Sequence, residues 1–225
     1  MKSINPFNLF ERTKALYEAE CIDWLDSSTK RFIEFRNWIV EPDRVKPALE
    51  KAMVRWIPKQ IVPGGAFFFP IYDHHNFLSL AQLRYLDPDP HKCLVHGSLP
   101  DHLSPWWFGN DQETLIRIAE LRKVLIVEGP SDVLACRIAL GNSYPVLSPL
   151  GKELKEIHQK DLLLLGVKKV QLLLDFDKAG QTSANIQKES LPFRVQRMIC
   201  PSHDPSDCLI VESAMKKLSK LLSVL

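Results

Sequence analysis

Two apolar runs in the second half of the chain each end in carboxylates and then pass into a turn. The first run covers residues 124–127 and ends at Glu128, and the second covers residues 170–174 and ends at Asp175 and Asp177. A short apolar run bounded by turn residues is typical of a buried strand. In an open α/β sheet, ligands bind at the carboxyl ends of the strands. We therefore expect the acidic groups to meet at one edge of a sheet.

Carboxylates that converge in this way repel one another unless a hard cation lies between them. Mg²⁺ held by a few carboxylates together with substrate phosphates is the usual occupant of such a site. Two ions about 3.5–4 Å apart can activate a 3′-hydroxyl and stabilise a leaving pyrophosphate. The pattern therefore predicts metal-dependent phosphate chemistry, with Mg²⁺ or Mn²⁺ as the cofactor.

Apolar strand-like runs and helix-like stretches alternate from residue 123 onward. We predict strands at 123–127, 145–147, 167–174 and 194–199, and helices at 131–140, 153–165, 179–189 and 206–222. Such alternation favours an α/β fold with a mostly parallel sheet flanked by helices on both faces. It also places a domain boundary near residue 122, which divides the chain into residues 1–122 and a catalytic domain of residues 123–225.

The first 122 residues carry a different pattern, typical of a smaller α+β subdomain. Residues 8–59 have mostly helical spacing, broken near Pro42, with a helix start at Asp43. Two strands are predicted at 66–71 and 77–86, with residues 73–76 as the hairpin loop. Residues 91–110 are predicted to be irregular and 111–121 to be helical. The prediction is thus a helical and β-hairpin subdomain that precedes the parallel sheet.

Net charge, cysteine content and the lack of long apolar stretches bear on the binding partners and the location expected for this chain. The net charge of the 225 residues is only +2, although residues 30–59 hold eight Lys/Arg against four Asp/Glu. That local excess is either a phosphate-binding face or an ordinary solvated helix surface. Five scattered cysteines without a CxxC motif fit a reducing compartment. No secretory signal and no apolar stretch of about 18 residues is present, so we expect a cytoplasmic protein.

The spacing of the acidic residues suggests individual roles. Asp132 comes four residues after Glu128, in the first turn of a predicted helix, where it caps backbone amides or reaches toward a metal. Asp175 and Asp177 flank Phe176 on an extended segment, so their side chains should share one face. Gly180 then permits the turn into the next helix.

These motifs resemble those of the Toprim domain. Glu128-Gly129-x-x-Asp132 followed by Asp175-x-Asp177-x-x-Gly180 is similar to the pattern shared by bacterial-type DNA primases, topoisomerases and some nucleases and recombination proteins. Within that group the chain is most similar to the catalytic core of bacterial and phage DnaG-type primases. The further matches lie in residues 69–73, 83–86, 92–94, 127–135 and 147–151 and in Asp204-Pro205. Ser206 stands where primases carry a second late aspartate, and Asp207 follows it.

The resemblance implies a primase-like nucleotidyltransferase that makes short RNA primers on single-stranded DNA from ribonucleoside triphosphates. Glu128, Asp175 and Asp177 would be catalytic, and the resemblance leaves open whether Glu128 is a metal ligand or a general base. Possible partners are a replicative helicase and a separate zinc-binding subunit. The implied metal-binding residues are Glu128, Asp132, Asp175, Asp177 and Asp204, and the implied nucleotide- or nucleic-acid-binding residues are Arg84, Lys92, Lys152 and Lys178.

Other interpretations of the same residues remain open at this point. The carboxylates would also serve a metal-dependent nuclease that uses water as its nucleophile, or the chain could be a non-catalytic replication-accessory protein that binds nucleic acid. Arg84 could form a cross-strand surface pair, and Lys92 could be a solvated loop residue. A zinc site built from residues 91–96, His102 and the Cys200-x-x-His203 pair is less favoured than ordinary loop residues. Residues 106–108 are expected to plug the junction between subdomains rather than to stack on bases.

Overall fold

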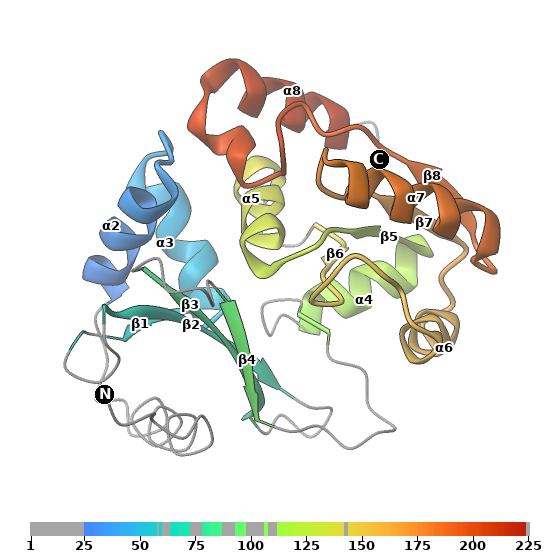
Figure 1. The fold of residues 1–225 in the computed structure, drawn as a ribbon, viewed down its shortest axis with the longest axis horizontal. Helices are drawn as coiled ribbons and strands as arrows, with labels where there is room; N and C mark the ends of the chain where they lie inside the picture. Colours follow the sequence, from blue (N-terminus) through green and yellow to red (C-terminus); the bar gives the residue numbers. More distant parts are fainter. Residues whose placement is uncertain are drawn as a thin grey trace.

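The computed structural model describes residues 25–57, 59, 64–72, 78–86, 93–97, 106–107, 112–141 and 144–223. Figure 1 shows two lobes side by side. One lobe is a small antiparallel sheet with two helices, and the other is a parallel sheet between helices. The predicted fold class, an α/β parallel-sheet domain preceded by a smaller α+β part, is confirmed. Among the described residues, no helix is long and apolar enough to cross a membrane.

The antiparallel sheet has the order β1-β2-β3-β4, formed by β1 (Arg55–Ile57), β2 (Ala66–Tyr72), β3 (Leu78–Tyr85) and β4 (Cys93–Gly97). Helices α2 (Leu25–Arg36) and α3 (Pro42–Lys51) accompany it. The Phe32 ring of α2 packs edge-on against Phe67 of β2, with the ring centroids 4.9 Å apart. Aromatic packing of this kind holds the helices to the sheet.

Three sequence predictions in this lobe are wrong. Residues 55–57 form a strand rather than the end of a helical stretch, because β2 pairs with them. Residues 93–97 form a strand rather than an irregular segment, because β3 offers them its free edge. Helix α3 begins at Pro42, one residue earlier than predicted. Proline suits the first position of a helix, where its missing N–H would have no partner anyway.

The parallel sheet has the order β6-β5-β7-β8. Helices α5 and α8 contribute to the core on one face, and α4, α6 and α7 to the core on the other. The predicted strands are present with shorter bounds, the predicted helices are present with bounds shifted by up to three residues, and the last predicted helix is split into η1 and α8. The elements are α4 (Gln112–Leu121), β5 (Lys123–Ile126), α5 (Pro130–Leu140), β6 (Val146–Leu147), α6 (Glu156–Leu164), β7 (Lys169–Leu172), α7 (Lys178–Ser190), β8 (Arg194–Arg197), η1 (Asp207–Ile210) and α8 (Glu212–Ser223).

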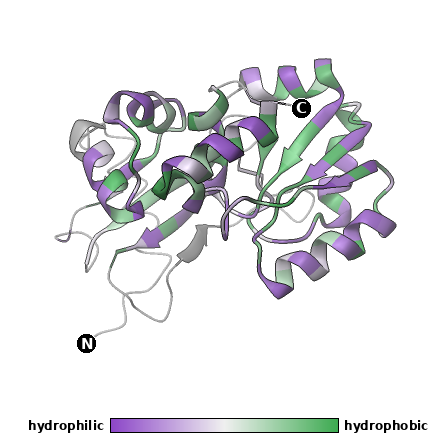
Figure 2. Ribbon diagram, turned by 90° about the horizontal axis from the view of Figure 1, so that it is seen from above, coloured by the Kyte–Doolittle hydropathy of each residue, from purple (hydrophilic) through white to green (hydrophobic). Residues whose placement is uncertain are grey.

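Alternate residues of β5 enter the two opposite cores. Val124 and Ile126 belong to the core beneath α4, α6 and α7, whereas Leu125 and Val127 belong to the core beneath α5 and α8. A strand covered on both faces reads as a continuous apolar run, which explains the pattern seen in the sequence. Figure 2 shows green, apolar stretches along the strands of this sheet and helices that carry both purple and green residues.

The two lobes share one hydrophobic core. The cluster that contains Phe69 of β2 also contains Leu134 of α5. Trp107 lies between the lobes: its indole N–H donates to the carbonyl of Pro70 at 3.1 Å, and its backbone pairs with Ser148. The prediction that the aromatic cluster fills the junction is confirmed for Trp107, while Phe108 lies outside the described residues. Division of the chain into domains at residue 122 stays a prediction.

Candidate metal-binding active site

Glu128 follows β5 at the carboxyl edge of the parallel sheet. Its carboxylate accepts a hydrogen bond from the backbone N–H of Asp175 at 3.0 Å, which ties the end of β5 to the end of β7. The Ser148 hydroxyl, at the end of β6, donates to the Glu128 carbonyl at 2.7 Å. The side chain of Glu128 is 13% exposed. Three strand ends therefore fix this carboxylate in a largely enclosed position.

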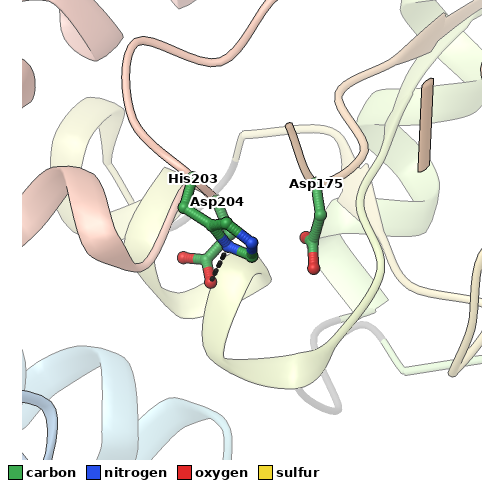
Figure 3. Close-up of side chains that lie close together, drawn as sticks. All are labelled: Asp175, His203 and Asp204. Atoms are coloured by element: carbon green, nitrogen blue, oxygen red, sulfur yellow. Dashed lines mark ion pairs between the residues drawn. The ribbon is translucent and has the colours of Figure 1, made fainter. Parts of the chain in front are cut away.

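Asp175 faces His203 and Asp204 across the edge of the sheet (Figure 3). One ligand atom from each of these side chains lies within 4.8 Å of the other two. His203 Nδ1 is 3.6 Å from an Asp204 carboxylate oxygen. Two carboxylates and an imidazole at this separation form a donor set suited to a divalent ion such as Mn²⁺ or, with substrate phosphates, Mg²⁺. The donor chemistry therefore fits the implied metal.

Asp132 lies behind this group and is buried. Its two carboxylate oxygens accept hydrogen bonds from the backbone N–H groups of Gly129, at 3.0 Å, and Ser206, at 3.2 Å. Asp132 thus connects the start of α5 to the segment that carries Asp204. Each of its oxygens accepts one backbone hydrogen bond, and the prediction that Asp132 also binds metal is not tested by these contacts.

Asp177 pairs with the start of α7 and with a lysine beside the acidic group. Its carboxylate caps α7 by accepting from the Gly180 N–H at 2.6 Å, and it lies 3.4 Å from the Lys152 ammonium. Lys152 is also 4.0 Å from Glu128. That the Asp175 and Asp177 side chains share one face stays a prediction. Lys152 stands between Glu128 and Asp177 as a cation contributed by the chain itself.

Glycine is required at position 180 because Asp175 and Glu128 leave no room for a side chain there. A Cβ atom built on Gly180 would overlap the carbonyl oxygen of Asp175 and would lie 3.1 Å from a Glu128 carboxylate oxygen. The absence of a side chain lets α7 begin directly beside the acidic group. The sequence spacing that identified Gly180 as a turn residue therefore has a steric cause.

Burial and mutual repulsion dominate the electrostatics. Desolvation, together with the charges of Glu128 and Asp204, raises the pKa of Asp175 to about 7. Desolvation also raises the pKa of Glu128, and it raises that of Asp132 well above its ordinary value. The Gly180 N–H, in contrast, lowers the pKa of Asp177. A bound divalent cation would replace the protons that this crowded group otherwise retains.

The basic residues implied by the resemblance are distributed around this edge. Lys178 is exposed at the start of α7. Arg84 lies on β3 with its guanidinium 6.0 Å from the Phe35 ring centroid. Desolvation and the charge of Asp204 raise the pKa of Asp207, and the charge of Arg84 is among those that oppose this rise. Lys92 lies outside the described residues. Of the three predicted basic residues that the structure describes, Lys152 is the one placed directly against the acidic group.

Sequence reasoning missed two residues of this site. His203 was considered only as half of a zinc pair with Cys200, whereas its ring lies beside Asp204. The cysteine instead lies 3.6 Å from Cys208, sulfur to sulfur. Arg36, at the end of α2, is 3.9 Å from Asp204 and 3.6 Å from Asp207. His203 had a signal, since it adjoins an implied metal ligand. Arg36 had none, because only packing between the lobes brings it here.

Comparison with known proteins agrees with this geometry. A family model for the Toprim domain matches residues 123–197. The DNA primase of Chlamydia trachomatis is 32% identical over 109 residues, which are 47% of this chain and 18% of that protein. The RNA polymerase domain of Mycobacterium tuberculosis primase DnaG superposes with a TM-score of 0.69 at 15% identity, covering 97% of this chain and 82% of that one. A DnaG primase catalytic domain bound to single-stranded DNA gives 0.64 at 18% identity, covering 96% and 80%.

Residues 123–197 therefore match the Toprim domain, an α/β unit with acidic residues at the carboxyl edge of its parallel sheet. More narrowly, the fold resembles that of the DnaG primase catalytic core, across both lobes. The matched segment spans 18% of the chlamydial relative.

Proposed function

We propose that this chain is a nucleotidyltransferase of the primase type, which joins ribonucleoside triphosphates into short RNA primers on single-stranded DNA. The observation that carries the proposal is the acidic group of Glu128, Asp175 and Asp204 at the meeting point of the strand ends, with a lysine at its rim. The solved DnaG catalytic domain of similar fold that is bound to single-stranded DNA supports this choice of template.

Asp175, His203 and Asp204 would hold one divalent ion, and Glu128 with Asp177 would complete the metal-binding edge. Asp132, which the resemblance implies as a further ligand, would act by positioning the segment that carries Asp204. When bound, such ions lower the pKa of a 3′-hydroxyl and neutralise charge that develops on the leaving pyrophosphate. Mg²⁺ or Mn²⁺ would serve.

The residues of the chain itself contribute proton handling and phosphate binding. Burial raises the pKa of Glu128, which suits a carboxylate that accepts a proton from a 3′-hydroxyl. Lys152 can exchange its pairing with Asp177 for a triphosphate oxygen. Arg84, Lys92 and Lys178 would contact the template or nucleotide backbone through sequence-independent and salt-sensitive interactions.

Primer synthesis on a single-stranded template with labelled ribonucleoside triphosphates and Mn²⁺ tests the proposal. We expect extended products from the wild-type chain and a loss of about 100-fold or more for Asp175→Asn, because one anionic ligand is removed from the reacting centre. Glu189→Gln, on the exposed side of α7, is the matched control and should retain activity. Degradation of the template without new product would instead identify a nuclease.

The partners follow as part of the same proposal. A primase core needs a route to unwound DNA, so a replicative helicase or a separate zinc-binding subunit would supply the template. Addition of such a partner should raise primer yield without altering the metal requirement. If yield stays unchanged with every partner tested, the chain acts without them.

A further inference from the structure

Two buried thiols flank the segment that carries His203 and Asp204. The Sγ atoms of Cys200 and Cys208 lie 3.6 Å apart, within hydrogen-bonding distance for sulfur, and no disulfide joins them. Cys200 is 5% exposed and Cys208 is fully buried. Residues 201–207 form the connection between them, so any change at the thiols acts on the metal-binding segment.

A pocket of about 690 Å³ gives small molecules access to Cys200. The pocket lies between the start of β7, the end of β8 and α8, and Met198 and Leu221 give it apolar walls. Three lysines, Lys169, Lys217 and Lys220, also line it. Apolar walls with several ammonium groups favour a small molecule that is anionic and partly apolar.

We propose that Cys200 and Cys208 form a reversible disulfide by exchange with a small anionic disulfide that enters this pocket, and that its formation weakens metal binding at Asp175, His203 and Asp204. The second half rests on the proposed function, because it assumes that these residues hold the metal. The first half, the bond itself, stands independently.

The proposed thiol–disulfide exchange proceeds in two steps, and atoms, electrons and protons balance across them. Cys200 first loses its proton to solvent. The Cys200 thiolate attacks one sulfur of the small disulfide, which forms a mixed disulfide and releases one small thiolate. Cys208 then loses its proton and attacks Cys200 Sγ, which releases the second small thiolate. The two protein thiols are oxidised, the small disulfide is reduced to two thiols, and the two protons end on those products.

Bond formation must displace part of the metal-binding segment. The sulfur atoms have to approach from 3.6 Å to about 2.05 Å. The segment is tied at several other points, so it cannot follow as a rigid body. The Phe176 N–H donates to the His203 carbonyl at 2.6 Å, and the Trp38 indole donates to the Ser206 carbonyl at 2.8 Å. A shift of about 1 Å at a reacting centre is enough to lower activity about 100-fold.

The test uses the full chain equilibrated with mixtures of reduced and oxidised glutathione, then acid quench, alkylation and peptide mapping by mass spectrometry. Mn²⁺ affinity is measured on the same samples by electron paramagnetic resonance. We expect a bond between Cys200 and Cys208, a rise of about tenfold or more in the Kd for Mn²⁺, and recovery with dithiothreitol. Cystamine, which is cationic, should react more slowly than glutathione disulfide.

Variants show whether the change in Mn²⁺ affinity comes from the Cys200–Cys208 pair or from another thiol. Cys208→Ser and Cys208→Ala should lose the reversible Mn²⁺ response, and thermal melts identify whichever variant retains the fold. Cys136→Ser, at a buried thiol of α5 outside the pair, should keep the response.

Three results would overturn the inference. Free thiols at both positions in oxidised glutathione would disprove the bond. An unchanged Kd for Mn²⁺ in the oxidised chain would disprove its effect, and the same response in Cys208→Ser would assign it to a mixed disulfide instead. Mapping and Mn²⁺ binding do not depend on primer synthesis, so a chain that makes no primers can still pass this test.

Discussion

Asp175 is partly buried, lies near the like-charged Glu128 and Asp204, and belongs to the candidate metal-binding group. Its folded-state pKa of about 7 lies above the ordinary value of 3.8. Its protonated form therefore contributes to the free energy of unfolding fully below pH 3.8, and that contribution is lost as the pH rises toward 7. A metal ion requires the ionised form, so metal binding and proton binding compete at this carboxylate.

We therefore predict a pH-dependent stabilisation by metal. The gain in Tm caused by saturating Mn²⁺ should grow between about pH 6 and about pH 8, as Asp175 gives up its proton. Differential scanning fluorimetry with and without Mn²⁺ measures this gain. Asp175→Asn should show little gain at either pH. An equal gain at both pH values in the wild-type chain would contradict the assignment.

Gly180 offers a steric test at the same site. Gly180→Ala should lower the free energy of unfolding by about 1–3 kcal/mol, because the new Cβ collides with the Asp175 carbonyl and crowds Glu128. Gly151→Ala is the matched control, since a Cβ there meets nothing within 4 Å. Urea denaturation of both variants makes the comparison. Equal stability of the two variants would contradict the prediction, because it would mean that α7 moves to accommodate the new Cβ without cost.

At the scale of residues, the sequence predicts those groups whose position depends on a strand end. Glu128 and Asp175 follow apolar runs directly, so their meeting at the sheet edge could be foreseen. The partners of Asp177 could not, because they depend on capping of α7 and on Lys152 from another loop. Arg36 reaches the site through contact between lobes, which no local pattern encodes.

At the scale of elements, the turn after α2 supports the metal-binding segment. The Trp38 indole donates to the Ser206 carbonyl at 2.8 Å, and the Ile39 N–H donates to the Leu209 carbonyl at 3.0 Å. These bonds connect the first lobe to η1, next to Asp204. The first lobe therefore helps to shape the site as well as to flank it.

Loss of the first of these bonds should affect stability and metal binding together. Trp38→Phe should lower the free energy of unfolding by about 0.5–1.5 kcal/mol and weaken Mn²⁺ binding, because the Asp204 segment loses a tether. Trp106→Phe removes a comparable indole bond, to Asp161, away from that segment. It should cost similar stability and leave Mn²⁺ affinity unchanged. Calorimetric titration would contradict the prediction if both variants bound Mn²⁺ equally.

The elements themselves were predictable to different degrees. The parallel strands and their helices could be predicted because apolar runs and turn residues alternate regularly. Strands β1 and β4 could not, since β1 is three residues long and β4 is held mainly by pairing with β3. Tertiary pairing overrides weak local preference in both cases.

At the scale of the whole molecule, the shared core makes the two lobes one cooperative unit. Buried residues of α3, β2, α5 and α8 belong to a single cluster. We predict a single urea transition, with tryptophan fluorescence and far-UV circular dichroism changing together. Trp38 and Trp56 report on the first lobe and are both buried. A fluorescence change at lower urea than the dichroism change would indicate lobes that unfold separately, as independent domains divided near residue 122 would.

The ammonium of Lys152, held between Glu128 and Asp177, acts as a tethered counter-ion for the acidic edge. A chelator that strips divalent ions would then leave a chain that is inactive yet still folded, with this lysine standing in for part of the missing charge. Restoring the ions would return the proposed activity without any refolding step, so metal depletion would inactivate the protein reversibly without unfolding it.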